Sequence, residues 1–333
     1  MKLSPRRAAS VVLALVTLAS AGQAQGGSID PQCKAGTPAQ RITQDACQKA
    51  LDLFTYMTPQ LGTGLTGGSA ISGEHSTLGP GHTSIGIRVN AVQARLPDVE
   101  AATIAITGAT ATNFVQKDQV LPVPTVDAAI GLFRGVPVGG AMAFGVDALL
   151  NLSILPSVST NELEVTLPDG SVKVGLGARV SLIAEGAFSP GIMFSYLRRD
   201  LPRISLKATP GSDEIIVDDF QVKTSAWRGV IGKSFGPLAL SAGFGQDTYQ
   251  TSALAAVSVT RLGVTTTATQ LAATQEVVRD NAFGSVSLHF GFFSLVAEGG
   301  RASGGKLTTF NTVGAGRADD PLTYGSAGLR FRF

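Results

Sequence analysis

LTYGSAGLRFRF, residues 322–333, carries a clear structural pattern. Successive side chains of an extended strand point to opposite faces. One face therefore carries Ala327, Leu329, Phe331 and Phe333, and the other carries Ser326, Gly328, Arg330 and Arg332. An apolar row opposite a basic row suits a wall with lipid on one side and water on the other. The stretch predicts a strand of a transmembrane β-barrel, and the alternative is an edge strand of a soluble β-sandwich.

The same alternation recurs in five further segments, and repetition makes a weak local signal stronger. These segments are residues 82–91, 143–155, 171–182, 238–245 and 285–290. Their apolar rows contain no charged residue, whereas the opposite rows are rich in Gly, Ser and Asn. A Lys or Arg at mid-depth on the lipid face of a barrel costs about 2 to 4 kcal/mol. We therefore predict an all-β protein, a transmembrane antiparallel β-barrel over residues 82–333.

Connection lengths predict the number of strands. Short connections near 137–140, 188–191, 233–237 and 291–292 alternate with long ones over 95–123, 156–170, 199–216, 249–280 and 302–320. Brief periplasmic turns and long extracellular loops are typical of outer-membrane barrels. The pattern predicts about 10–12 strands, with 14 as an upper bound.

The terminal segment resembles the closing strand of bacterial outer-membrane β-barrel proteins. That strand characteristically ends in an aromatic residue, usually Phe, which the assembly machinery reads. The resemblance implies that Phe331 and Phe333 form an assembly signal and that the barrel assembly machinery of a Gram-negative cell is a partner. It also implies contact with outer-membrane lipid and lipopolysaccharide.

The beginning of the chain predicts export. Lys2, Arg6 and Arg7 precede an apolar run that ends in small residues, as in a cleaved signal peptide. We expect cleavage after Ala24, with Ala21 as the second choice. Only 15% of the residues are charged and 40 of the 333 are Gly, whereas soluble domains have about 25% charged residues. The sequence thus predicts an outer-membrane location.

Residues 25–81 predict a separate helical and Gly-rich plug or cap. Apolar residues recur at helical spacing within 43–57, and we expect Pro59 to end this short helix. The tract over residues 61–82 is Gly-rich and is expected to turn sharply. Cys33 and Cys47 are the two cysteines of the chain. Because an exported chain meets an oxidising compartment, we predict that they form a disulfide.

The inward charges are the candidate functional set. They are Arg88, Asp127, Asp147, Lys173, Arg179, Glu298, Arg330 and Arg332. In one interpretation they pair with one another and seal the lumen. In the other they line a solute path, and because Arg88, Arg330 and Arg332 lie along one seam, that path is expected to prefer anions.

Further resemblances concern architecture. A helical or Gly-rich element ahead of a barrel is similar to the long-chain fatty acid transporter family of hydrophobic-compound channels. The tracts LGTGLTGG (61–68) and LPVPTVDAAIGL (121–132) are similar to segments of outer-membrane barrel families that carry no assigned activity. The first resemblance implies a porin-like transport protein, and the second implies no activity.

We predict a passive channel for small amphipathic or anionic solutes. The alternative is a structural or adhesive surface barrel with a sealed lumen. An outer-membrane hydrolase is a weaker alternative, because only His75, His82 and His289 could supply a histidine base. We expect no enzyme activity, no cofactor and no metal site. We also expect no nucleic-acid partner, since the net charge is +2 and no basic block occurs.

Overall fold

The structure is a computed structural model. It describes residues 27–68, 74–99, 103–155, 158–159, 163–208, 213–268 and 270–333. The predicted signal peptide, residues 1–24, lies outside the described residues. Among the described helices, none combines the length and the apolar character needed to cross a membrane.

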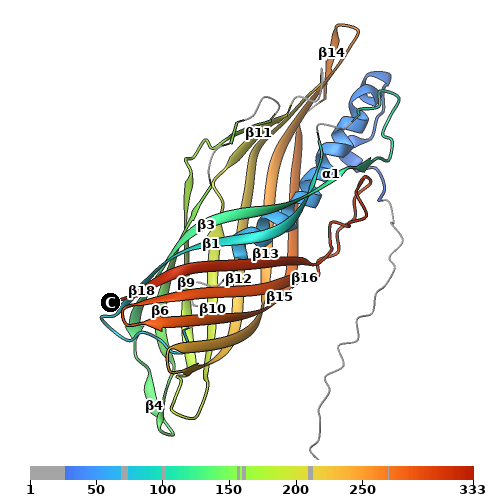
Figure 1. The fold of residues 1–333 in the computed structure, drawn as a ribbon. Helices are drawn as coiled ribbons and strands as arrows, with labels where there is room; N and C mark the ends of the chain where they lie inside the picture. Colours follow the sequence, from blue (N-terminus) through green and yellow to red (C-terminus); the bar gives the residue numbers. More distant parts are fainter. Residues whose placement is uncertain are drawn as a thin grey trace, which may run out of the picture.

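A closed antiparallel sheet dominates the described residues (Figure 1). Ten of its strands form a ring in which each strand pairs with its neighbours. They are β1 (Thr83–Pro97), β3 (Gln116–Phe133), β6 (Gly145–Ile154), β9 (Val172–Ile183), β10 (Gly191–Asp200), β12 (Glu214–Phe235), β13 (Leu238–Arg261), β15 (Leu271–Phe290), β16 (Phe293–Ser303) and β18 (Leu322–Arg332). The first strand, β1, pairs with the last, β18, and closes the ring. The predicted barrel of about 10–12 strands is confirmed.

The two ends of the ring differ. At the end that we call the turn end, strands are joined by tight turns at 236–237 and 291–292 and by a hairpin of β4 (Val136–Val138) and β5 (Ala141–Ala143). At the other end, the extended end, β12, β13 and β15 continue and short strands are added. These are β7 (Val158–Ser159), β8 (Leu163–Thr166), β11 (Ile204–Ala208) and β14 (Val264–Thr267). Strands β4 and β14 mark the opposite ends in Figure 1.

The extended end corrects one expectation. Residues 199–216 and 249–280 were expected to be long loops, but most of their described residues belong to strands. Strand β13 alone has 24 residues, whereas a tilted strand crosses a membrane in about 9 to 11. The wall therefore projects well beyond the membrane on this side.

The outer surface carries an apolar belt. Ile87, Leu176 and Phe244 point outward from three different strands and are 57%, 64% and 65% exposed. The outward rows are those that the sequence alternation predicted, and no charge interrupts them in those segments. At the turn end, the rings of Phe292 and Phe331 stack 6.3 Å apart, as aromatic residues do at a membrane interface. A closed wall with such a belt is built to lie in lipid.

The apolar side of the wall changes along β13. Leu240 and Phe244 face outward and are exposed, but farther along the strand the buried Val257 and Val259 face inward. Between these two parts, outward Gln246 and Gln250 donate hydrogen bonds to Asp280 and Glu276, respectively. The belt thus ends near Gln246, and beyond it the outside of the wall meets water.

A long helix lies against the inside of the wall. Helix α1 (Pro38–Thr66) has 29 residues, which makes it about 43 Å long at 1.5 Å per residue. Its N-terminus has a capping box, in which the side chains of Thr37 and Gln40 bond each other's backbone N–H groups. A short 3-10 turn, η1 (Pro31–Cys33), precedes it. Phe54 of the helix packs edge-to-face on Phe220 of β12, with ring centroids 5.8 Å apart.

The helix is longer than the predicted short one. Pro59 does not end it, and Gly62 and Gly64 also lie within it. A proline inside a helix costs about 3 kcal/mol, so packing must offset this cost. The hydroxyl of Thr58 donates to the carbonyl oxygen of Phe54 (3.0 Å). Gly62 lies so close to the Tyr249 ring that a methyl group at this position would overlap it.

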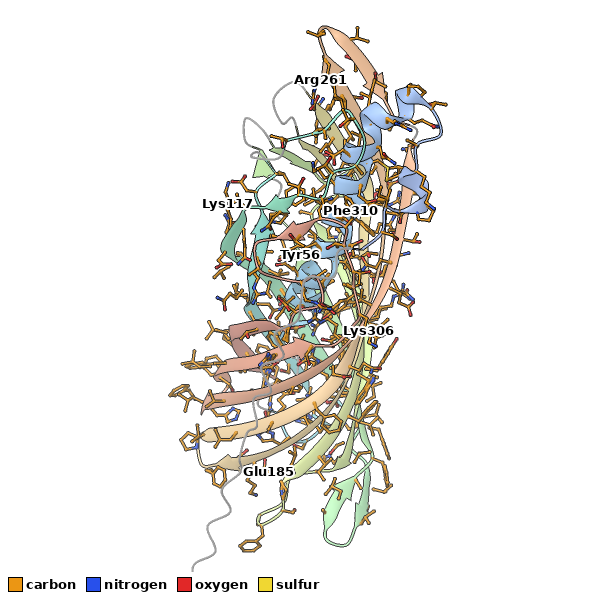
Figure 2. All side chains as sticks on the ribbon, turned by 90° about the vertical axis from the view of Figure 1, so that its right-hand side faces the viewer. Tyr56, Lys117, Glu185, Arg261, Lys306 and Phe310 are labelled. Atoms are coloured by element: carbon orange, nitrogen blue, oxygen red, sulfur yellow. A yellow bond between two sulfur atoms is a disulfide. The ribbon has the colours of Figure 1, made fainter. Side chains whose placement is uncertain are left out.

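Smaller elements complete the extended end. Strands β2 (Asn113–Phe114) and β17 (Thr312–Val313) pair in parallel with each other. Tyr56 of α1 packs beside them with Phe114 and Val313. Figure 2 shows Tyr56 and Phe310 near the helix, with Arg261 toward the extended end and Glu185 at the turn end.

Candidate functional site

The N-terminal part of the chain runs through the ring from one end to the other. At the extended end, the N–H of Gly27 donates to the carbonyl oxygen of Thr309 (2.9 Å). Helix α1 then contacts strands from several sides of the ring, including β1, β12, β13 and β18. At the turn end, Thr83 and Phe333 exchange backbone hydrogen bonds of 3.0 and 2.9 Å where β1 begins. We call residues 27–68 and 74–82 the plug.

Three wall arginines bind the C-terminal end of the helix. Arg199 of β10 donates to the carbonyl oxygens of Leu65 (3.0 Å) and Thr66 (3.1 Å). Arg228 of β12 donates to the carbonyl oxygen of Thr66 (2.8 Å), and Arg88 of β1 donates to that of Gly67 (3.1 Å). The last carbonyls of a helix have no partner within the helix and carry partial negative charge. Guanidinium groups supply both the hydrogen-bond donors and the positive charge that this end of the helix lacks.

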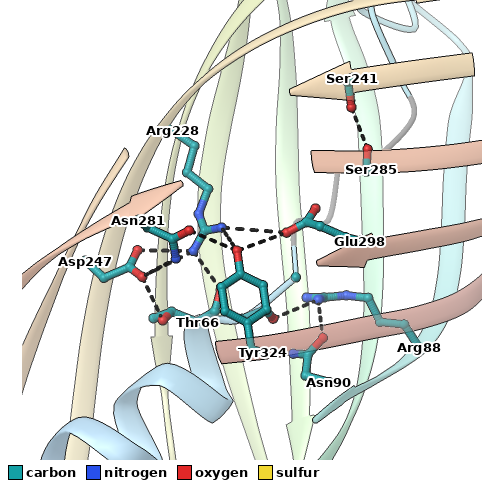
Figure 3. Close-up of polar contacts among 12 residues, drawn as sticks. Thr66, Arg88, Asn90, Arg228, Ser241, Asp247, Asn281, Ser285, Glu298 and Tyr324 are labelled. Atoms are coloured by element: carbon teal, nitrogen blue, oxygen red, sulfur yellow. Dashed lines mark hydrogen bonds and ion pairs between the residues drawn. The ribbon is translucent and has the colours of Figure 1, made fainter. Parts of the chain in front are cut away.

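Arg228 also anchors a polar cluster across the lumen (Figure 3). Its guanidinium forms an ion pair with Asp247 (3.1 Å) and donates to the Tyr324 hydroxyl (3.3 Å). Tyr324 in turn donates to Asn281 (2.9 Å) and to Glu298 (3.3 Å). The cluster joins β12, β13, β15, β16 and β18, so it ties half of the ring together.

Arg88 is already neutralised within the wall. It pairs with Asp127 on the adjacent strand and donates to Asn90 (2.6 Å). Asp127 also accepts a hydrogen bond from the side-chain amide of Asn151 (2.6 Å). In the seam expected along Arg88, Arg330 and Arg332, the charge of Arg88 is thus balanced by Asp127 of β3, which lies diagonally across from it, opposite Gly86.

Glu74 of the plug lies in a cage of wall arginines. Its carboxylate pairs with Arg179, and the nitrogens of Arg332 and Arg330 lie 3.3 and 3.8 Å from it. Arg179 also pairs with Asp147 (2.6 Å). Glu74 and Arg179 are fully buried. These charged contacts bind residues 74–82, which we call the lower plug, to β9 and β18.

Wall glycines make room for the lower plug. They are Gly131 of β3, Gly145 of β6, Gly191 of β10 and Gly232 of β12. A methyl group on any of them would overlap residues 75–79 of the plug. At Gly232 the overlapping group is the ring of His75, which is 4% exposed. The inner surface of the wall is thus shaped around this segment.

At the extended end, two helix carboxylates hold connecting segments over the helix. Asp45 accepts hydrogen bonds from the backbone N–H groups of Ala105 (2.8 Å) and Thr110 (3.0 Å). Asp52 accepts from the N–H groups of Asn311 (2.8 Å) and Phe310 (3.1 Å). Burial raises the pKa of the Asp52 carboxyl above its ordinary value, although these N–H groups oppose the shift. Both carboxylates therefore help to hold these connecting segments against the helix.

A disulfide joins Cys33 to Cys47, with a Cα–Cα distance of 5.6 Å. It ties η1 to the first part of α1 at the extended end, where the N–H of Asp30 also donates to Gln48 (2.7 Å). We call residues 27–37 with this disulfide the head of the plug.

The remaining predicted residues lie as follows. Asp147, Arg179, Glu298 and Arg330 are buried inside the ring. Lys173 is 37% exposed near the extended end of β9, where it pairs with Asp169 (3.4 Å). The side chain of Arg332 is 52% exposed at the turn end. Phe333 is 65% exposed there, and its role in assembly stays a prediction.

Several lumen residues were not predicted from sequence. They are Glu74, Arg199, Arg228, Asp247 and Tyr324. Every second residue along 191–200 and 214–235 faces the lumen. Applying this alternation to the two segments could have revealed Arg199 and Arg228. Glu74 is the one carboxylate in the tract 61–82, which is its only signal in the sequence.

The hollow found beside these groups is small. A cavity of about 20 Å³ lies among Arg88, Glu298 and Arg330, enough for about one water molecule. Two larger hollows, of about 540 and 510 Å³, lie on the apolar outer face and at the rim near Arg95. Within the described ranges, no group of three or more His, Cys, Asp or Glu side chains could hold a metal ion.

The closed ring, the apolar belt and the filled polar interior together decide the class of protein. The chain is an outer-membrane β-barrel protein. Since short turns are typical of the periplasmic side, the turn end is periplasmic and the extended end is extracellular.

Comparisons with solved structures find other outer-membrane barrels. The translocator domain of autotransporter NalP from Neisseria meningitidis has 13% sequence identity and a TM-score of 0.42, and the match covers 87% of this chain and 98% of that one. The beta domain of the Bordetella autotransporter Brka has 13% identity and a TM-score of 0.36, with coverage of 75% and 99%. The Ail protein of Yersinia pestis, in complex with a heparin analogue, has 10% identity and a TM-score of 0.31, with coverage of 76% and 99%. At such scores these likenesses carry no argument about what the barrel does. The sequence matches no protein-family model and no curated protein.

Proposed function

We propose that the protein is a sealed outer-membrane barrel that anchors and presents an extracellular structure. That structure consists of the projecting ends of β12, β13 and β15, the short strands beside them and the head of the plug. The observation that carries the proposal is that the plug is bound to the wall at two levels. Its helix end is held by Arg88, Arg199 and Arg228, and its Glu74 carboxylate is held by Arg179.

Energetics favour a plug that stays in place. Removing one partner of a buried ion pair typically costs about 3 to 5 kcal/mol, because the other charge is left unpaired in a low-dielectric site. Withdrawing the lower plug would leave Arg179 with one carboxylate in place of two. It would also expose the glycine-lined surface that fits residues 75–79. A permanently seated plug avoids both costs.

A gated channel for anionic solutes is the second candidate. Arg199 favours it, because in the described structure its hydrogen bonds go to backbone carbonyl oxygens and to no carboxylate. An anion that displaced the helix end would find Arg199 and Arg228 close together. In this function the plug would move, whereas in the sealed barrel it would not.

A hydrolase is not part of the proposal. His75 packs against wall glycines on the periplasmic half of the lumen, and His289 lies one residue before the end of β15 at the turn end. His82 directly precedes β1 at the same end. A base for external substrates would be needed at the opposite rim.

Liposome swelling separates the two candidates. Proteoliposomes that contain the purified full-length mature protein are placed in isotonic solutions of a small sugar and of a small dicarboxylate. The sealed barrel predicts no swelling in either solution. Swelling in the dicarboxylate alone would support the anion channel, and swelling in both would indicate an open pore, so either result would overturn the proposal. A general diffusion porin in parallel liposomes serves as the positive control.

A further inference from the structure

The N-terminal part of the chain passes through the barrel in one direction, from the extended end to the turn end. Strand β1 begins at the turn end, where Thr83 pairs with Phe333. Helix α1 begins at the opposite end, next to the segment that contains Thr309. The chain therefore enters the lumen from the extended end and leaves it at the turn end, as Figure 1 shows for α1 and β1.

The side of the membrane follows from the connections. The turn end has two-residue turns at 236–237 and 291–292, and short turns are typical of the periplasmic side. The extended end carries the strand extensions and the β13–β14 hairpin, whose tip residue Leu262 is fully exposed. Outer-membrane barrels place their long connections outside the cell. The head of the plug lies at this extracellular end.

The head is folded there and is not a loose tail. Gly27 bonds to Thr309, Asp30 bonds to Gln48, and the disulfide closes the segment between Cys33 and Cys47. Much of its surface is nevertheless open to solvent, since Gln32 and Lys34 are exposed. The head is thus a compact, cross-linked element whose surface is open to contact from outside the barrel.

From this path we infer that the barrel holds its own N-terminal segment, residues 27–37, on the cell surface, tethered through the lumen by α1. This inference deepens the presenting role proposed above, although the path itself does not depend on that role.

Epitope insertion in intact cells tests the inference. One tag is placed directly before Gly27, a second between Leu262 and Gly263 at the β13–β14 tip, and a third between Gly139 and Gly140 in the β4–β5 turn. Added side chains at the three glycines Gly139, Gly140 and Gly263 would meet open space. Heat-modifiable migration on gels shows that each tagged protein has folded.

We expect external proteinase to remove nearly all signal of the first two tags from intact cells, whereas the third tag is lost only after the outer membrane is permeabilised. If the tag before Gly27 behaves like the tag at Gly139, the through-lumen path is wrong. If all three assignments are reversed, the barrel lies the other way up, and the inference fails as well. Neither outcome bears on liposome swelling, so failure here is distinguishable from failure of the sealed barrel.

Discussion

Glu74 and Arg179 form an ion pair inside the barrel in which the two side chains are 1% and 0% exposed. Glu74 belongs to the plug and Arg179 to wall strand β9. The pair therefore joins two parts of the chain that have different roles, and it does so where no water competes for either charge. Several predictions depend on this relationship between plug and wall.

Replacing Glu74 by Gln should loosen the lower plug. The substitution leaves Arg179, Arg330 and Arg332 without this carboxylate, and loss of a buried partner costs about 3 to 5 kcal/mol. We expect residues 74–82 to become sensitive to added protease at lower temperature, with little change in the β-content by circular dichroism. Asp169→Asn is the matched control, because Asp169 pairs with Lys173 at a 37% exposed site, where ion pairs contribute about 0 to 1 kcal/mol. Equal protease sensitivity of both variants would contradict the role given to Glu74.

The glycine-lined surface makes a second prediction. Gly191→Ala should displace the plug at His75, because the added methyl group would overlap the backbone there. Gly299→Ala is the control, since a methyl group at that outward position meets nothing within 4 Å. Hydrogen exchange measured by mass spectrometry should show faster exchange over 74–82 in the first variant only. Unchanged exchange in Gly191→Ala would mean that the plug does not rest against this wall.

The apolar belt makes a third prediction. Leu176→Arg should impair membrane assembly, because Leu176 is 64% exposed on the outward face and an arginine in the hydrocarbon region costs about 2 to 4 kcal/mol. Thr248→Arg, on the outward face of β13 beyond Gln246, should assemble normally. Heat-modifiable migration of the outer-membrane fraction reports the result. Normal assembly of both variants would argue against the position of the belt.

The head should depend on its disulfide, whereas the barrel should not. A bridge that closes a loop of about 15 residues is worth about 3 kcal/mol in the chain-entropy model. Replacing both Cys33 and Cys47 by Ser should make residues 27–37 protease-sensitive on intact cells and leave heat-modifiable migration unchanged. Mass spectrometry of the non-reduced wild-type protein should find the two cysteines in one linked peptide pair. Two free thiols would contradict the structure of the head.

Asp52 predicts a pH effect at the extracellular end. Burial raises the pKa of its carboxyl in the folded protein, so the folded state binds this proton more tightly than the unfolded state does. Asp52 therefore contributes most to stability below its ordinary pKa, and that contribution is lost as the pH rises through the raised value. We expect the stability of the wild type to rise on acidification through this raised pKa, and Asp52→Asn, which cannot titrate at this position, to show a weaker rise. An equally strong rise in the Asn variant would contradict the pKa shift at Asp52.

Much of the wall could be predicted, because lipid on one side and a polar lumen on the other require apolar and polar side chains to alternate along each strand. Leu176 and Phe244 lie on the face that the alternation assigned to lipid. Farther along β13 the odd-numbered residues still face inward. There the inward face is apolar, with Val257 and Val259, because α1 covers it. This change of apolar face lies within residues 249–280, which were predicted to be a long connection. It marks the point where the strand leaves the membrane.

The plug was less predictable for a different reason. Pro59 is a local signal to end a helix, but burial of the helix against the barrel wall outweighs it. The partners of Arg88 and Arg179 depend on strand register and on the path of residues 74–82, which no local pattern specifies. The existence of inward charges could thus be predicted, whereas their pairing could not.

Planar-bilayer conductance of the wild-type mature protein shows directly whether the plug seals the lumen. The full plug is retained and a salt gradient is applied across the bilayer, with a variant that lacks residues 27–73 as the comparison. We expect no stable conductance for the wild type and step-like conductance for the shortened protein, provided that the latter still shows heat-modifiable migration. Gly191→Ala gives a second comparison that keeps the whole chain, and it should conduct intermittently. Steady wild-type conductance, of either ion selectivity, would contradict a lumen sealed by the plug.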